Sequence, residues 1–151
     1  MYLSYSLSQV AMILLIGAIG GVVTVLVARR ARRFTREILA AVLIVAAAFY
    51  IVFAAVNGAG VGWITAEALG VVIFGGMGVM GVRGSKWWLA AGWALHPVWD
   101  VGLHYFGAGR AFAPEAYVIA CISWDWITAA YVAFLPTNGI HTVRDNSTAT
   151  T

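Results

Sequence analysis

Long apolar runs alternate with short polar segments along the chain of 151 residues. Each run is close to the roughly 20 residues that a helix needs to cross the hydrocarbon core of a bilayer. The pattern predicts an all-α bundle of five transmembrane helices, at residues 7–28, 38–56, 63–82, 87–107 and 115–135. We expect one transmembrane domain, residues 1–136, followed at residues 137–151 by a polar tail that is disordered because it has few apolar residues to bury.

The composition supports a membrane protein. Hydrophobic residues make up 62% of the chain and charged residues 10%, whereas soluble domains carry about 25% charged residues. The formal charge of +3 does not indicate a nucleic-acid partner, because five of the nine basic residues lie in one short segment, at Arg29, Arg30, Arg32, Arg33 and Arg36. The predicted partner is the lipid bilayer, and no nucleic acid is expected.

Two basic loops predict the orientation of the bundle. The arginine segment and the turn at residues 83–86 fall on the same side of the membrane when five helices alternate in direction. Basic loops are retained in the cytoplasm. We therefore predict an extracytoplasmic N-terminus and a cytoplasmic C-terminal tail.

Small residues mark two of the predicted helices. Residues 63–82 hold several glycines, and Gly17 and Gly21 lie one turn apart in the first apolar run. Small residues let the backbones of neighbouring helices approach closely. We favour close packing inside one bundle, and an interface in a homo-oligomer is the alternative.

Ionisable residues inside the fourth run are the strongest functional signal. His96, Asp100 and His104 are spaced four residues apart, so they share one face of a helix. A charge at the centre of a bilayer costs about 2.5 to 3.5 kcal/mol even on the lenient insertion scale, so such residues usually face an internal polar site. This face is therefore expected to point into the bundle.

Counting helix rise from the outer ends brings further polar residues to the same depth. Antiparallel packing places Glu67, Cys121 and Asp125 at depths that overlap those of His96 and Asp100. We predict that His96 and Asp125 approach within direct or single-water hydrogen-bonding distance. A lone buried cysteine such as Cys121 acts more often as a small apolar core residue than as a nucleophile.

The spacing also limits a metal site. Residues four apart on a helix lie about 5 to 6 Å apart at Cβ, so neighbouring members of the set His96, Asp100 and His104 can share one ion. The two histidines are about 12 Å apart along the helix, too far for one ion to bridge. Three interpretations stay open: a structural hydrogen-bond network, an acid/base or ligand-binding site, and a site for a divalent transition metal.

The run H-P-V-W-D-V-G-L-H at residues 96–104, with C-I-S-W-D-W at residues 121–126, resembles a family of small bacterial membrane proteins of unknown function. The resemblance implies that His96, Asp100, His104, Cys121 and Asp125 belong to the family's pattern. It implies a multi-pass protein of the cell inner membrane and no particular activity.

Two classes of function fit these residues. One is a small membrane-embedded enzyme that acts on a lipid or isoprenoid-like substrate by acid/base or metal-assisted chemistry. Its candidate catalytic residues are His96, Asp100 and Asp125, and its candidate substrate-binding residues are His104, Glu67, Trp99, Trp124 and Cys121. The alternative is a carrier, a proton- or cation-binding protein, or an accessory membrane protein that uses the same residues.

Overall fold

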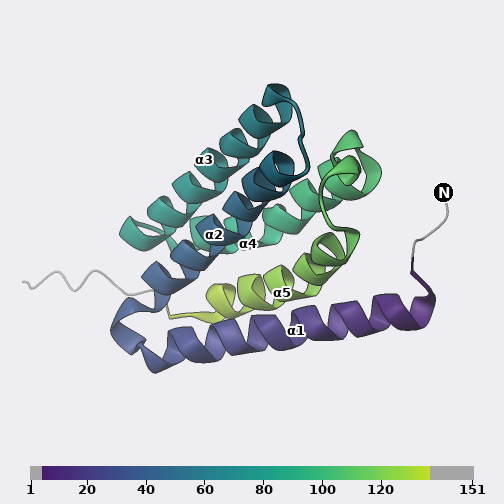
Figure 1. Cartoon of the computed structure of the whole chain (residues 1–151). Coiled ribbons are helices and arrows are strands. Elements are labelled where there is room, and N and C mark those ends of the chain that lie inside the picture. The colour runs from purple at the N-terminus through teal and green to yellow at the C-terminus, as the bar shows by residue number, and fades with distance from the viewer. Residues whose placement is uncertain (1–4, 137–151) are drawn as a thin grey trace, which may run out of the picture.

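A computed structural model describes residues 5–136 of the chain, and helices joined by short turns account for nearly all of them (Figure 1). Five α-helices are present in that part: α1 (Leu7–Arg30), α2 (Thr35–Val56), α3 (Val61–Arg83), α4 (Lys86–Asp100) and α5 (Glu115–Phe134). Two short 3-10 helices, η1 (Arg32–Phe34) and η3 (Ala108–Ala111), precede α2 and α5. The predicted polar tail lies outside the described residues.

Four helices are long and apolar enough to cross a membrane, namely α1, α2 together with η1, α3 and α5. The helix α4 has 15 residues and continues directly into the six-residue π-helical segment η2 (Val101–Phe106). Together α4 and η2 run over residues 86–106 and so cover nearly all of the predicted span 87–107, but α4 alone is shorter than a spanning helix and the segment carries His96, Asp100 and His104. The all-helical fold is confirmed with four helices of membrane-spanning character, and the fifth crossing and the orientation stay predictions.

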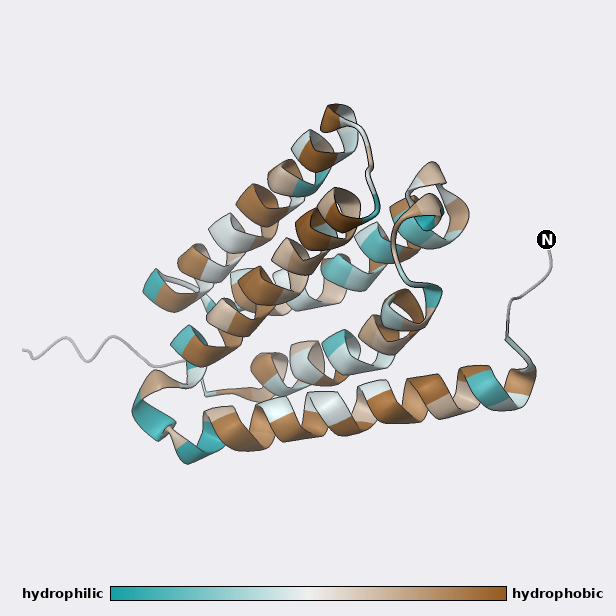
Figure 2. Ribbon diagram, viewed as in Figure 1, coloured by the Kyte–Doolittle hydropathy of each residue, from teal (hydrophilic) through white to brown (hydrophobic). Residues whose placement is uncertain are grey.

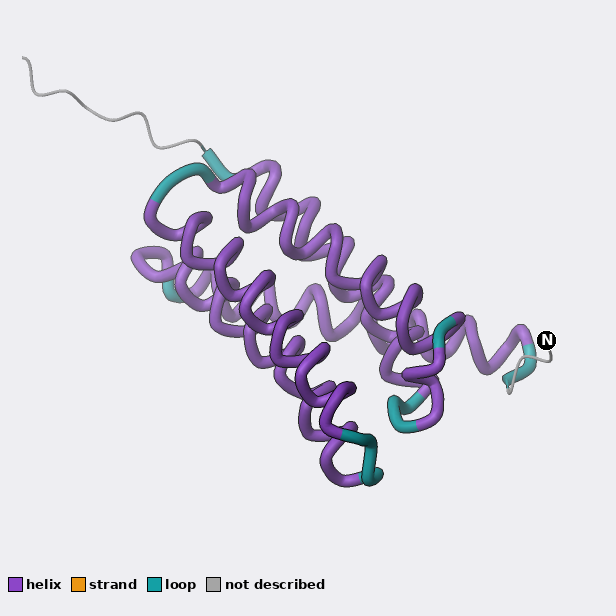
Figure 3. Tube along the Cα trace, turned by 90° about the horizontal axis from the view of Figure 1, so that it is seen from above, coloured by secondary structure: helices purple, strands orange, loops and turns teal. Residues whose placement is uncertain are grey.

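The helix α5 packs between α1 and α4, and α3 packs against both α2 and α4, so that α2 and α4 lie between α5 and α3 in the bundle (Figures 1 and 3). The helix α1 lies along α5 and contacts α2 only weakly. Figure 2 shows apolar residues along most of α1, and several of them, including Leu15, Ile19 and Leu26, are exposed. An apolar surface of this extent suits contact with lipid acyl chains rather than water.

Glycines bring α1 against α5. A Cβ atom on Gly17 would overlap the carbonyl oxygen of Ala120, and one on Gly21 would meet the backbone of Trp124. These glycines therefore serve packing within the chain, the interpretation that we favoured. A homo-oligomer stays a prediction.

A buried lysine fixes the start of α4 beside the end of α5. The ammonium group of Lys86 donates hydrogen bonds to the carbonyl oxygens of Ala133 and Leu135. Carbonyls at the end of a helix lack partners within the helix and attract a positive charge. This contact sets the relative height of α4 and α5, and with it the depth at which their polar residues meet.

Candidate metal centre

Four side chains from two neighbouring helices meet in the middle of the bundle. His96 and Asp100 lie one turn apart on α4, and Cys121 and Asp125 lie one turn apart on α5. One potential ligand atom from each of the four falls within 4.8 Å of all the others. All four residues are buried, with exposed fractions of 0% for His96 and Asp100, 6% for Cys121 and 1% for Asp125. We call this group the inner cluster.

The histidine links the two helices. Its Nδ1 atom lies 2.8 Å from Oδ2 of Asp125 and 3.4 Å from Oδ2 of Asp100. The contact between His96 and Asp125 confirms the prediction made from their depths. The imidazole ring of His96 also packs edge-to-face on Phe74, with the two ring centroids 4.9 Å apart.

The inner cluster is not satisfied by its own hydrogen bonds. Among residues 5–136, neither carboxyl oxygen of Asp100 has a hydrogen-bond partner. The Nε2 atom of His96 also has none there. A buried polar group without a partner costs about 1 to 3 kcal/mol, and more when it is charged. The arrangement also holds two carboxyl groups against one imidazole, so a cation at the centre of the cluster would balance its charge.

The donor atoms fit a transition-metal ion. Ligands at about 2.0 to 2.3 Å from a tetrahedral Zn²⁺ ion lie roughly 3.5 Å from one another. The ligand-type atoms of the inner cluster lie within 4.8 Å of one another, which is close to that spacing, and the shortest pair, Nδ1 of His96 and Oδ2 of Asp125 at 2.8 Å, would move slightly apart around an ion. One thiolate, one imidazole and two carboxylates form a mixed set that suits Zn²⁺ and similar divalent ions better than Mg²⁺ or Ca²⁺, which prefer oxygen ligands.

The second candidate histidine, His104, lies elsewhere. His104, on η2, places Nε2 3.0 Å from Oε1 of Glu67 on α3, and both residues are buried. We call these two residues the outer pair. The predicted metal ligands His96, Asp100 and His104 therefore do not come together, because two turns of helix separate the histidines and His104 has its own carboxylate. In place of His104, Cys121 and Asp125 of α5 join His96 and Asp100 in the inner cluster.

Tyr50 on α2 lies between the two groups. Its ring stacks on that of His104 with centroids 4.1 Å apart, and its centroid lies 6.3 Å from that of His96. Its hydroxyl group makes no hydrogen bond within the described chain. We did not single out Tyr50 from the sequence, because a tyrosine inside an apolar run gives no sign of the face on which it lies.

The two tryptophans that we assigned to substrate binding have different places. Trp124 packs over Gly20 and Gly21 of α1 and also lines a groove between α2 and α5. Trp99 packs edge-to-face on Phe74, with centroids 6.0 Å apart, and faces Gly70 of α3. Of these two tryptophans, only Trp124 would contact a molecule that enters this groove.

The groove itself has a volume of about 220 Å³ and reaches the inner cluster. Its α2 side is apolar, and its α5 side includes Cys121 and Asp125 beside Trp124. It runs over helices of membrane-spanning character. The groove therefore joins the hydrocarbon side of the bundle to two of the four ligand-type residues.

Comparison with known proteins agrees with the resemblance to a family of unknown function. No curated protein and no solved structure matches the chain significantly. One family matches most of the chain, over residues 12–138, and this range includes the inner cluster, the outer pair and the groove. The chain therefore belongs to the family of unknown function DUF6010.

Proposed function

We propose that the inner cluster binds one divalent transition-metal ion of the Zn²⁺ type. The observation that carries this proposal is the approach of four buried ligand-type side chains to within 4.8 Å of one another. The unsatisfied oxygens of Asp100 support it, because a metal ion gives a buried carboxylate the partner that the described residues do not supply.

We propose further that the protein is a membrane-embedded enzyme whose substrate is a lipid or isoprenoid-like molecule. The groove between α2 and α5 supports this, because its apolar lining suits a hydrocarbon chain and its inner end touches Cys121 and Asp125. A bound divalent ion polarises a carbonyl or phosphoryl oxygen as a Lewis acid. In such metal-assisted chemistry Asp100 and His96 would hold the ion. In acid/base chemistry without an ion, Asp100, with His96 beside it, would be the group that gives or takes the proton.

The corresponding experiment uses the intact protein in vesicles of total membrane lipid from the expression host. Metal-loaded wild type, chelator-treated wild type and Asp100→Asn protein given the same Zn²⁺ treatment as wild type are incubated in parallel, and the lipids are compared by mass spectrometry. We expect one lipid species to change only with loaded wild type. A lipid pool that is identical in all three samples would remove the enzyme proposal and leave the metal site standing.

A carrier of cations or protons is the second candidate. The outer pair and Tyr50 favour it, because they extend a line of buried polar groups from the inner cluster toward the end of the bundle near η3. Zn²⁺ uptake into vesicles loaded with a metal-sensitive dye distinguishes the two functions. A carrier is expected to move Zn²⁺ into the vesicles without changing the lipids. An enzyme is expected to change a lipid without moving Zn²⁺.

For the membrane arrangement we propose five crossings, with α4 and η2 as the fourth, an extracytoplasmic N-terminus and a cytoplasmic C-terminus. The proposal rests on the two basic segments, at residues 29–36 and 83–86, which lie at the same end of the bundle. Alkaline phosphatase fused after residue 136 is expected to be inactive, and a fusion in the turn at residues 57–60 is expected to be active. An active C-terminal fusion would overturn this arrangement.

A further inference from the structure

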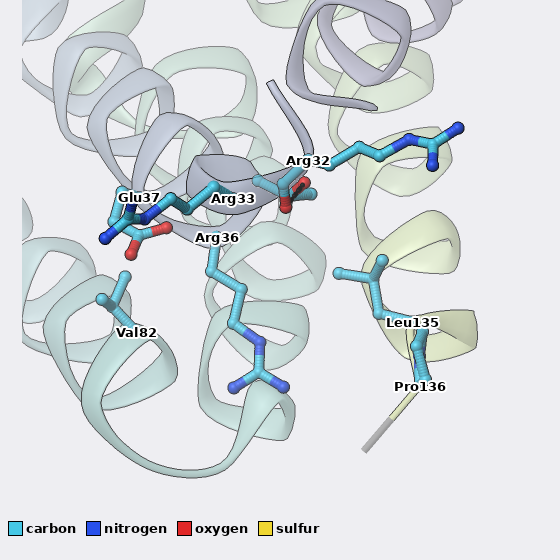
Figure 4. Close-up of a pocket in the computed structure, with 8 residues that line it drawn as sticks. Arg32, Arg33, Arg36, Glu37, Val82, Leu135 and Pro136 are labelled. Carbon is cyan, nitrogen blue, oxygen red and sulfur yellow. Dashed lines mark hydrogen bonds between the residues drawn. The ribbon is translucent and has the colours of Figure 1, made fainter. Parts of the chain in front are cut away.

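A basic pocket lies at the end of the bundle where α1 turns into α2 (Figure 4). It has a volume of about 250 Å³ and is lined by Arg32 and Arg33 of η1 and by Arg36 and Glu37 of α2. Three guanidinium groups and one carboxylate give the pocket an excess of two positive charges. It lies apart from the inner cluster and shares no residue with it.

The arginines of this pocket are not neutralised by the protein. Across residues 5–136, none of them forms an ion pair with a carboxylate, and the one hydrogen bond made by their side chains joins Arg36 to the carbonyl oxygen of Gly84 at 3.3 Å. The backbone beneath them is held in place, because the Thr35 hydroxyl group is shared as a hydrogen-bond donor between the carbonyl oxygens of Ala28 and Arg32. Arg32 and Arg33 therefore extend from a fixed turn without a carboxylate partner, in opposite directions in Figure 4, and the guanidinium group of Arg33 lies 5.7 Å from the ring centroid of Phe34.

The opposite wall of the pocket is apolar. It is formed by Val82 at the end of α3 and by Leu135 and Pro136 just after α5. Figure 4 shows Leu135 and Pro136 across the pocket from Arg33 and Val82. A ligand that fits carries an anionic group for the arginines and an apolar part for this wall, and free inorganic phosphate has only the first.

The position of the pocket indicates that the membrane supplies such a ligand. Four helices of membrane-spanning character, α1, α2, α3 and α5, all have an end at this pocket or beside it. The end of a spanning helix lies at the level of the lipid headgroups, where phosphates are concentrated. Basic pockets between transmembrane helices bind anionic headgroups, and the planar guanidinium fork matches two phosphate oxygens at once.

We propose that this pocket binds the phosphodiester headgroup of one anionic phospholipid, with Arg32, Arg33 and Arg36 supplying the positive charge around the phosphate and with the glycerol and upper acyl chains against Leu135 and Pro136. The proposal requires a bilayer around the helices and does not depend on the metal site or on any reaction. A basic segment that only sets orientation needs positive charge but no shaped pocket, whereas a bound headgroup needs both.

The test uses the full chain purified in neutral detergent, because no charged membrane surface is then present and only specifically bound lipid is retained. Phosphatidylglycerol and phosphatidylcholine are added in equal amounts, and native mass spectrometry measures the lipid bound to each protein. The variant Arg32→Gln/Arg33→Gln removes two pocket charges. The matched control Arg29→Gln/Arg30→Gln removes two charges from the end of α1, outside the pocket lining.

We expect wild type to retain one phosphatidylglycerol molecule, and the pocket variant to bind it about 30-fold more weakly, which corresponds to about 1 kcal/mol for each arginine. The control variant is expected to stay within about threefold of wild type, because it keeps the pocket. Equal losses in both variants, or equal retention of phosphatidylcholine by wild type, would overturn the proposal. So would displacement of the lipid by millimolar inorganic phosphate, which would make free phosphate the ligand.

Discussion

Two buried histidines on the α4–η2 segment meet carboxylates in different ways. In the outer pair, one imidazole meets one carboxylate at 3.0 Å, so that Nε2 of His104 and Oε1 of Glu67 satisfy each other. In the inner cluster, one imidazole meets two carboxyl groups and a thiol, and both oxygens of Asp100 lack a hydrogen-bond partner within residues 5–136. The outer pair is balanced in charge, although Nδ1 of His104 has no hydrogen-bond partner within residues 5–136, whereas the inner cluster has an excess of acids that a cation or a proton can balance.

Residues of the same types at the same spacing therefore meet different partners in the outer pair and in the inner cluster. Position relative to neighbouring helices decides between them, because η2 faces α3 with a single acid and α4 faces α5 with a cysteine and an acid. The predictions below test whether the outer pair is structural and the inner cluster binds an ion.

The largest effect is expected from breaking the outer pair. Replacing Glu67 with alanine leaves His104 buried without its partner, and breaking a buried pair in this way costs about 3 to 5 kcal/mol of stability. Unfolding by a denaturing detergent measures the change. The control Glu67→Gln keeps a hydrogen-bond acceptor and should be much milder. If Glu67→Ala instead leaves stability unchanged but lowers metal content, the pair belongs to the metal site.

The next effect is stabilisation by the ion itself. Zn²⁺ at 100 times its dissociation constant should stabilise wild type by about 2.7 kcal/mol, because it binds the folded state alone. The variant Cys121→Ala, which lacks the thiol ligand, should show much less stabilisation. The same unfolding assay with and without added Zn²⁺ measures both. Equal stabilisation of the two proteins would place the ion outside the inner cluster.

A smaller effect on stability is expected from Asp100→Asn. The amide keeps the shape of the carboxylate and can donate a hydrogen bond, so stability should change by no more than about 1 to 2 kcal/mol. Ion binding should be lost, because an amide supplies no anionic ligand. Unfolding measurements are paired with elemental analysis of the purified variant. Folded Asp100→Asn protein with unchanged metal content would favour a structural network.

The smallest effect is expected at Tyr50. The variant Tyr50→Phe keeps the ring that stacks on His104 and removes a hydroxyl that makes no hydrogen bond in the described chain. Stability should stay within about 1 kcal/mol of wild type, and metal content should not change. A large loss of ion binding would show that Tyr50 joins the two groups, and would weaken the distinction between them.

The helices and part of the inner cluster were predictable from the sequence. Apolar runs of about 20 residues set the helices, and the antiparallel count of helix rise brought His96 to the depth of Asp125. The glycines of α1 were predictable as packing residues, because a close backbone contact leaves no room for a side chain. Each of these follows from length or depth along a helix axis.

Rotation about the helix axis was not predictable in the same way. Helices that are apolar on all sides give no periodic signal of which face is inward. Depth alone therefore placed Glu67 near Asp100, whereas the structure pairs Glu67 with His104. Tyr50 escaped notice for the same reason. The π-helical turn η2, which carries His104, also has no signature in the pattern of apolar residues.

Metal content measures the central claim most directly. Wild type, Glu67→Gln and Asp125→Asn proteins are purified in mild detergent, equilibrated with Zn²⁺, freed of excess ion and compared by elemental analysis. We predict one ion per chain in wild type and in Glu67→Gln, and none in Asp125→Asn. Folded wild type without a bound ion, or Asp125→Asn protein with the same content as wild type, would contradict the assignment of the inner cluster as a metal centre.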